Sequence, residues 1–136
     1  MLYGHVIIHE LMHVLVARFL GVEYHKIQIG ANLLSINITS KLIVSLIPIG
    51  GYVEVDRKCL INQTNIKIFM FFEIAPFFNL IISIVSCYYV KGIYGFFLCV
   101  IGFFIFIASQ AMPAQSDLGG MCRLMYEKKK FTNKNQ

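Results

Sequence analysis

Three long apolar segments constrain this chain more than any other feature of its sequence. They cover about residues 2–22, 66–90 and 93–111, and each approaches the ~20 residues with which a helix crosses the hydrocarbon core of a bilayer. Apolar residues make up 57% of the 136 residues and charged residues only 14%, against about 25% charged residues in a soluble domain. Because a globule of this size has too little interior to bury that apolar surface, we predict a polytopic membrane protein.

The segment between the first two apolar stretches has a different pattern. Apolar and polar residues alternate over 26–29 and 36–39, as is typical of β-strands. A more continuously apolar run over 42–47 is then interrupted by a proline and two glycines. We therefore predict a mainly α-helical fold, forming one membrane-embedded domain over 1–136. Its core has three transmembrane helices, and a small sheet or pair of hairpins over 23–56 lies between the first and the second.

Positive charge gathers at the end of the chain, where five Lys and Arg residues form a basic tail over 121–136. Such a tail occurs in nucleic-acid-binding proteins, but beside an apolar segment it is typical of a cytoplasmic flank facing anionic lipid. We therefore expect contact with the lipid bilayer and no nucleic-acid partner. The turn between the second and third segments offers only Lys91, so the positive-inside rule places the β region and the tail in the cytoplasm.

The first apolar segment contains an H-E-x-x-H sequence, His9-Glu10-Leu11-Met12-His13. Histidines at positions i and i+4 are separated by only about 40° around a helix and about 6 Å along it, so both imidazoles can reach one metal ion. Glu10 lies beside them, where it can hold and deprotonate a water molecule without being a ligand. Ionisable groups at membrane depth are costly and usually functional. We predict that His9 and His13 bind zinc and that Glu10 is the catalytic base.

A catalytic zinc site needs a third protein ligand and an open position for water. Asp117 is the only acidic residue in the segment 111–120, which follows the third apolar stretch and is interrupted by proline and glycine. The third stretch returns to the cytoplasmic side just before Asp117, and His13 lies in the same half of the membrane. We therefore favour Asp117 as a ligand; the alternative is that it caps the helix that follows.

Four motifs in this order resemble the site-2 protease family of intramembrane metalloproteases. Ile8-His9-Glu10-Leu11-Met12-His13 is similar to the family's zinc-binding helix, together with Ala17-Arg18 and Gly21-Val22. The strand segment of Ile47-Pro48-Ile49-Gly50-Gly51-Tyr52-Val53, the small–Pro–x–x–Asn element of Ala75-Pro76-Phe77-Phe78-Asn79, and the Asp-Gly motif within 113–120 complete the set. The resemblance implies a three-helix core, a Zn²⁺ cofactor with Asp117 as third ligand, and cleavage of a membrane-spanning protein substrate.

The resemblance extends to the type of protease. No insertion is long enough for a PDZ domain, so the chain is more similar to compact members such as the stage IV sporulation protease, which implies a bacterial plasma membrane and allows for a regulatory membrane partner. Substrate contact is expected at Gly51, Tyr52, Asn79 and Gln110, although Asn79 is also suited to bonding between helices.

Two positions depart from the family's pattern, and the start of the chain is short. Leu118 separates Asp117 from Gly119, and Gln110 replaces an asparagine that is common in the family. Only eight residues precede His9, fewer than in the family's zinc helix, and this favours a truncated N-terminus.

The apolar segments contain further titratable residues besides the H-E-x-x-H sequence. Glu73, inside the second apolar segment, either tunes the site or forms a hydrogen bond at the kink expected from Pro76. His5 is expected to be a partner of a ligand or a plain helix residue, and the four cysteines show no ligand spacing.

The alternatives to a protease are a membrane protein that binds metal for structure or transport, and a soluble or peripheral zinc enzyme.

Overall fold

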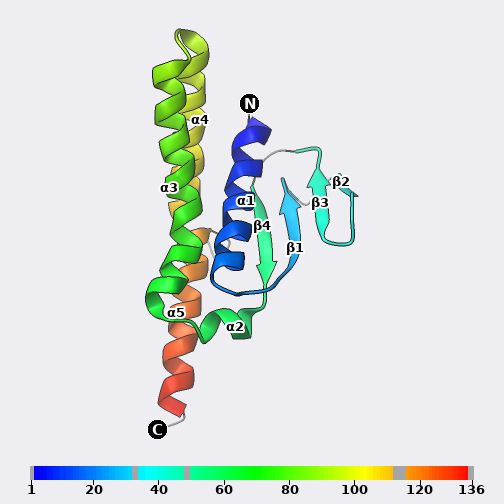
Figure 1. Cartoon of the computed structure of the whole chain (residues 1–136), viewed down its shortest axis with the longest axis vertical. Helices are drawn as coiled ribbons and strands as arrows, with labels where there is room; N and C mark the ends of the chain where they lie inside the picture. The colour runs from blue at the N-terminus through cyan, green and yellow to red at the C-terminus, as the bar shows by residue number, and fades with distance from the viewer. Residues whose placement is uncertain (1, 32–33, 48–49, 112–115, 135–136) are drawn as a thin grey trace.

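The computed structural model describes residues 2–31, 34–47, 50–111 and 116–134. Within these ranges the elements follow one another in this order: α1 (Leu2–Phe19), β1 (Tyr24–Ile29), β2 (Ser35–Asn37), β3 (Leu42–Ser45), β4 (Gly51–Val55), α2 (Arg57–Ile61), α3 (Asn65–Tyr89), α4 (Ile93–Gln110) and α5 (Asp117–Lys134). Figure 1 shows α1 between the sheet on one side and the paired helices α3 and α4 on the other. The position of α1 between these layers determines which of its residues are buried.

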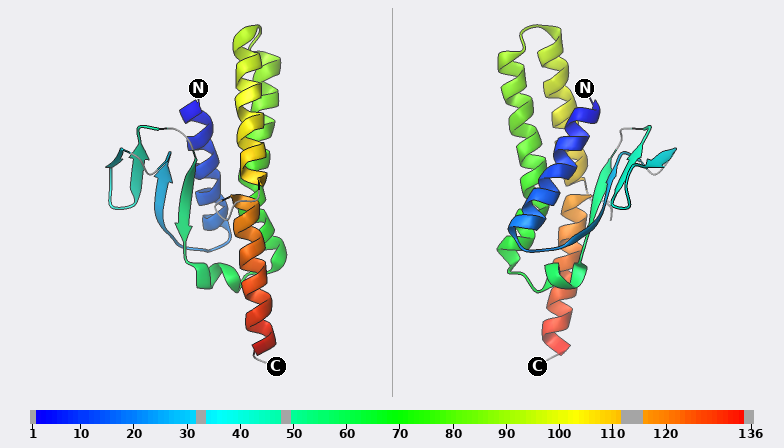
Figure 2. Two further views of the ribbon diagram at one scale, coloured as in Figure 1. Left: turned by 180° about the vertical axis from the view of Figure 1, so that it is seen from behind. Right: turned by 45° about the vertical axis from the view of Figure 1, so that its right-hand side comes forward.

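Helices α3 and α4 form a hairpin that extends well beyond the other elements (Figures 1 and 2). At 1.5 Å per residue they are about 38 Å and about 27 Å long. In the described part of the chain they are the two helices long and apolar enough to cross a membrane. Three exposed tyrosines, Tyr88, Tyr89 and Tyr94, flank the turn at Lys91, an arrangement typical of the membrane–water interface. The second and third apolar segments are thus confirmed as helices of membrane length.

Helix α1 is shorter and more polar than the first predicted span, which extended to residue 22. It ends at Phe19, and Gly21 follows with a φ of 69°. The amide of Val22 donates to the carbonyl of Ala17, and that of Gly21 to Arg18, which is the hydrogen-bond pattern of a Schellman motif. Helix α1 is not one of the two membrane-length apolar helices, because its histidines, Glu10 and Arg18 lower its mean hydropathy. A third transmembrane helix stays a prediction.

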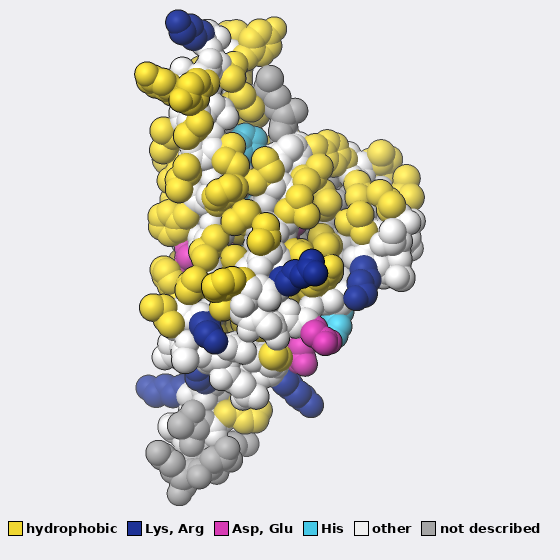
Figure 3. All heavy atoms as spheres, in the orientation of Figure 1, with side chains coloured by type: hydrophobic (Ala, Val, Ile, Leu, Met, Phe, Trp, Pro, Cys, Tyr) yellow, Lys and Arg dark blue, Asp and Glu magenta, His cyan; other side chains and the backbone are white. Residues whose placement is uncertain are grey.

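Helix α1 buries most of its ionisable side chains and exposes several large apolar ones. Its buried residues include three histidines and one glutamate, whereas Ile7, Leu11 and Leu15 are exposed. Figure 3 shows apolar side chains covering much of the molecule, with Lys and Arg gathered mainly toward the end that contains the C-terminus. Apolar groups outside and ionisable groups inside are what a lipid solvent requires.

The predicted β region is confirmed as one small mixed sheet with the strand order β2-β3-β1-β4. Strand β1 pairs with β3 in parallel, with Ile27 opposite Leu42, and with β4 in antiparallel, with Ile29 opposite Gly51. The parallel pair was not expected, because period-two alternation does not reveal the direction in which strands pair. The sheet packs on α1 through β1 and β4, and β4 is an edge strand.

The apolar core joins the carboxyl end of α1 to α2, α3 and α5. Its buried members are Val16, Ala17, Leu20, Val22, Leu60, Ile68, Phe71, Met121 and Leu124. Met121 and Leu124 lie one and two turns into α5, so their burial fixes the first turn of that helix against α1 and α3. The predicted basic tail is therefore helical over most of its length, and its first turns pack against the core.

We predict that Gly102→Ala destabilises the α3–α4 hairpin. A Cβ atom on Gly102 would lie 1.5 Å from the Oγ atom of Ser83, whereas one on Gly4 would meet nothing within 4 Å. Close approach through small residues is how membrane helices associate, and overpacking costs about 1–3 kcal/mol. Thermal unfolding in detergent micelles should show a lower midpoint for Gly102→Ala only. Gly4→Ala is the control, since alanine favours helix by about 0.5–1 kcal/mol over glycine; equal effects of the two changes would contradict the prediction.

Candidate active site

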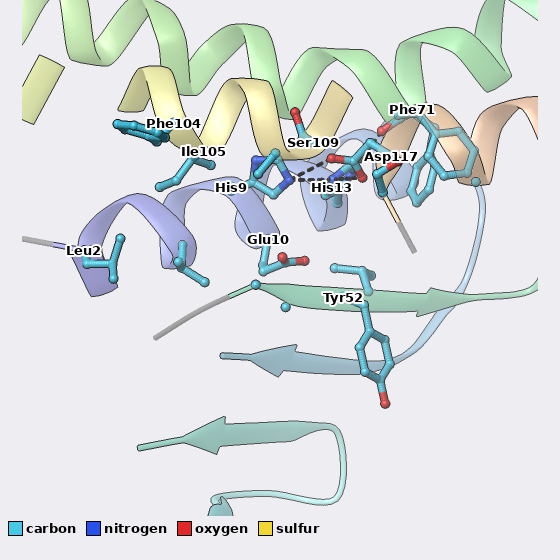
Figure 4. Close-up of a pocket in the computed structure, with 18 of the residues that line it drawn as sticks. Leu2, His9, Glu10, His13, Tyr52, Phe71, Phe104, Ile105, Ser109 and Asp117 are labelled. Atoms are coloured by element: carbon cyan, nitrogen blue, oxygen red, sulfur yellow. Dashed lines mark hydrogen bonds and ion pairs between the residues drawn. The ribbon is translucent and has the colours of Figure 1, made fainter. Parts of the chain in front are cut away.

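The structure brings His9, His13 and Asp117 together at one point (Figure 4). The Nε2 atom of His9 lies 3.1 Å from Oδ2 of Asp117, and the Nε2 atom of His13 lies 3.1 Å from Oδ1. The two Nε2 atoms are 3.2 Å apart. Both histidines are on the buried face of α1, and Asp117 is the first residue of α5. His9 and His13, four residues apart on one helix, thus meet Asp117, which follows His13 by 104 residues.

The hydrogen bonds of His13 indicate what this group of side chains can hold. Its Nδ1 atom lies 2.8 Å from the carbonyl oxygen of Phe71, which can only accept, so Nδ1 bears the proton. In the neutral tautomer the lone pair on Nε2 then faces an oxygen of Asp117, and this arrangement requires a proton or a cation between them. His9, His13 and Asp117 each offer one possible ligand atom, and these atoms lie within 4.8 Å of one another. The donor set therefore fits a metal ion.

Asp117 faces the two histidines while its neighbour Ser116 caps the helix. The Oγ atom of Ser116 accepts a hydrogen bond from the amide of Gly119 at 3.1 Å, as an N-cap side chain does. Burial alone would raise the pKa of Asp117, but hydrogen bonds with His13 and His9 outweigh it and lower the pKa to about 2. The carboxylate is therefore ionised and faces both imidazoles.

Glu10 lies beside the three candidate ligands, and one of its carboxylate oxygens has no hydrogen-bond partner among the described residues. It is 3% exposed, and the oxygen without a partner is Oε2. Strand β4 passes close to it at Gly51, where an added Cβ atom would lie 2.6 Å from Oε1 of Glu10. Because glycine has no side chain, Gly51 leaves space for the Glu10 carboxylate. A buried carboxylate oxygen without a partner is costly to the fold and available to a bound water.

The site opens into a cavity of about 550 Å³, a size typical of ligand pockets. All three candidate ligands and Glu10 line it, as do Gly50, the first three residues of β4, and residues of α3, α4 and α5. Figure 4 shows Tyr52 and Phe71 toward one end of this space and Leu2, Phe104 and Ile105 toward the other. Glu10 therefore faces a space large enough for a peptide segment.

Two of the predicted substrate-binding residues, Asn79 and Gln110, do not line the cavity, whereas Gly51 and Tyr52 do. Asn79 is fully buried, and its Nδ2 atom donates to the carbonyl of His5 at 3.1 Å, which joins α3 to α1. Gln110 donates to Oε2 of Glu73 at 2.8 Å and so joins α4 to α3. The structure thus shows the interhelical alternative for Asn79 and a hydrogen-bonded Glu73.

Some features of the site were not identified from the sequence. The carbonyl of Phe71 that orients His13 is a backbone group, and no sequence pattern marks it. Ser116 was not proposed as a cap, although a serine immediately before a helix is a recognised signal. The prolines of the two loop motifs, Pro48 and Pro113, lie outside the described residues.

Two imidazoles and a carboxylate converge beside a glutamate with an unpaired oxygen, within one cavity, and this is the arrangement expected at the centre of a metallopeptidase. The family model of Peptidase family M50 matches residues 1–134. The chain therefore belongs to this family, the site-2 protease family, whose members are metallopeptidases. A comparison with curated protein sequences found no match. Membership and the two apolar helices together support a membrane protease that acts on protein substrates.

We predict that Asp117→Asn and His9→Ala each release the metal, whereas Glu10→Gln retains it. Loss of a ligand should weaken binding by more than the about 10- to 100-fold loss that follows removal of a ligand's hydrogen-bond partner. Metal content of protein purified in detergent, measured by mass spectrometry, tests this. Equal metal in Asp117→Asn and the unchanged protein would remove Asp117 from the set of ligands.

Proposed function

We propose that this protein is an intramembrane zinc metalloprotease that hydrolyses a peptide bond in or near a transmembrane segment of a protein substrate. The observation that supports this most directly is the convergence of His9, His13 and Asp117 beside the uncommitted oxygen of Glu10. A donor set of two imidazoles and one carboxylate, with a position left open, is typical of catalytic zinc.

Each residue of the site has a distinct role in the proposed reaction. Zinc, when bound, would act as a Lewis acid toward the scissile carbonyl and lower the pKa of a water molecule. His9, His13 and Asp117 would hold it. Glu10 takes the proton of the attacking water and returns it to the leaving amine as the peptide bond breaks. The hydrogen bond from His13 to the carbonyl of Phe71 keeps its Nε2 atom directed toward Asp117, with which it would hold the metal.

Strand β4 offers a way to present the substrate. A transmembrane helix bonds its own carbonyls, so the substrate must unwind locally before a peptide bond can be attacked. Among the described residues, strand β4 pairs with β1 and has no strand on its other side, and residues 50–53 line the cavity beside Glu10. An extended substrate segment can pair with this edge, as in β-strand addition.

We further propose that the β region and α5 lie on the cytoplasmic side of a bacterial plasma membrane. The positive charge of α5 and the near absence of basic residues at the α3–α4 turn support this orientation. The candidate ligands would then lie toward the cytoplasmic end of the membrane helices, because Asp117 follows α4 at that end.

The rival functions make different predictions. A structural or transport metal site would not need Glu10, and full protein ligation would be expected around the ion. A soluble or peripheral zinc enzyme would be released by a carbonate wash, whereas the apolar outer faces of α3 and α4 predict that detergent is required.

We expect Glu10→Gln to abolish cleavage and to leave metal content unchanged. The amide has nearly the shape of the carboxylate but cannot take a proton, and loss of a general base costs about 10²- to 10⁴-fold in rate. Co-expression with candidate single-span proteins, followed by immunoblotting for the fragments, compares the two forms. Full cleavage by Glu10→Gln would exclude the role assigned to this residue.

Gly51→Ala should impair cleavage because its methyl group would enter the space of the Glu10 carboxylate. Displacement of a catalytic group by about 1 Å can cost about 10²-fold in rate. The carbonyl of Gln28 is equally close, at 2.6 Å, so thermal unfolding is measured alongside. Gly4→Ala is the matched control on α1. Normal cleavage by a folded Gly51→Ala protein would show that this contact does not position Glu10.

A further inference from the structure

The cavity continues past the metal ligands toward the amino end of α1. Two residues of α1, separated by one helical turn, and four residues of α4 line this part. We call it the α1–α4 arm, and it is formed by Leu2, Val6, Ile101, Phe104, Ile105 and Ala108. Figure 4 shows Leu2, Phe104 and Ile105 on the side of His9 that lies away from Tyr52 and Phe71. The arm is thus one of two directions in which a bound chain can leave the reacting centre.

The chemistry of the arm is uniform. The α4 residues recur at positions i, i+3, i+4 and i+7, so they form one face of that helix. On α1, Val6 and Leu2 continue the face that bears His9 and His13, about one and two turns before His9. All six side chains of the arm are apolar.

We propose that the α1–α4 arm is a specificity subsite that receives a bulky apolar side chain of the substrate next to the bond that is cleaved. This inference rests on the proposed proteolytic function and adds the class of side chain that is recognised. A leucine or phenylalanine side chain fills the space between the two helices, whereas alanine leaves apolar walls without contacts. The occupant is a residue of the substrate because the arm is continuous with the space in front of Glu10.

Exposure of the arm agrees with a substrate that arrives from lipid. Val6 is buried at the base of the arm, whereas Phe104 is 66% exposed on α4. The arm is therefore closed toward the molecule and open toward the apolar outer surface of the hairpin. Residues of a transmembrane segment that enters here are themselves mostly apolar.

A larger side chain at Ala108 would fill the arm and so test the subsite. This residue lines the cavity and is exposed, so Ala108→Phe adds bulk to the arm without displacing the core. Single-span reporter proteins with one common span carry Ala, Leu or Phe at successive positions, and mass spectrometry of the fragments identifies the residues beside the cut. The unchanged protein should favour Leu or Phe over Ala by about tenfold or more, and Ala108→Phe should remove that preference. Ile107→Phe is the control, since Ile107 is 47% exposed and outside the cavity lining.

A binding measurement separates this inference from the proposed function. In a Glu10→Gln background, the Leu reporter should co-purify with the protein in greater yield than the Ala reporter, and adding Ala108→Phe should equalise the two. If the unchanged protein cuts no reporter, the proposed function fails and this binding ratio alone decides the role of the arm. The subsite is overturned if cleavage and binding do not depend on the size of the side chain. It is also overturned if Ala108→Phe leaves the preference for Leu or Phe unchanged.

Discussion

The burial of ionisable side chains on one face of α1 is the constraint on which the rest of the structure depends. Such groups are costly in a low-dielectric interior unless they find partners. His13 meets the carbonyl of Phe71 and the carboxylate of Asp117, and the backbone carbonyl of His5 meets Asn79. Helices α3 and α5 are therefore placed where they satisfy polar groups of α1. Glu10 keeps one oxygen unpaired, and this is the position at which the proposed chemistry needs an available base.

The third candidate ligand, Asp117, is positioned by apolar packing. Met121 and Leu124 on α5 are buried against the carboxyl end of α1 and the start of α3. Because Met121 follows Asp117 by four residues, its burial directs the first turn of α5 toward the same region. The cap at Ser116 satisfies the backbone of that turn and leaves the carboxylate of Asp117 free for the histidines. The same packing that buries the core thus brings Asp117 to His9 and His13.

The sheet and the helices contribute different parts of the site. Helix α1 supplies two candidate ligands and the proposed base, α5 supplies the third candidate ligand, and β4, an edge strand among the described residues, passes beside Glu10. Gly51 allows this approach because it has no side chain to meet the carboxylate. The cavity extends on both sides of this point, which suits an extended chain that passes through the site and is cut in the middle.

Much of this arrangement was predictable from the sequence because it depends on local spacing. The pattern of His9, Glu10 and His13 places three functional groups on adjacent parts of any helix, and the length of the apolar segments predicts α3 and α4 closely. Alternation over 26–29 predicted strand β1. These features follow from the 3.6-residue and two-residue periods of helix and strand, which need no knowledge of the rest of the chain.

Only the tertiary structure decided which distant groups meet. The sequence alone left Asp117 either a ligand or a helix cap, and Ser116 takes the cap while Asp117 faces the histidines. The structure also showed that Asn79 and Gln110 pair with other helices outside the cavity, and that β1 and β3 run in parallel. The physical reason is that contacts between remote segments depend on how buried faces pack together, and local periodicity does not determine the partner of a buried face.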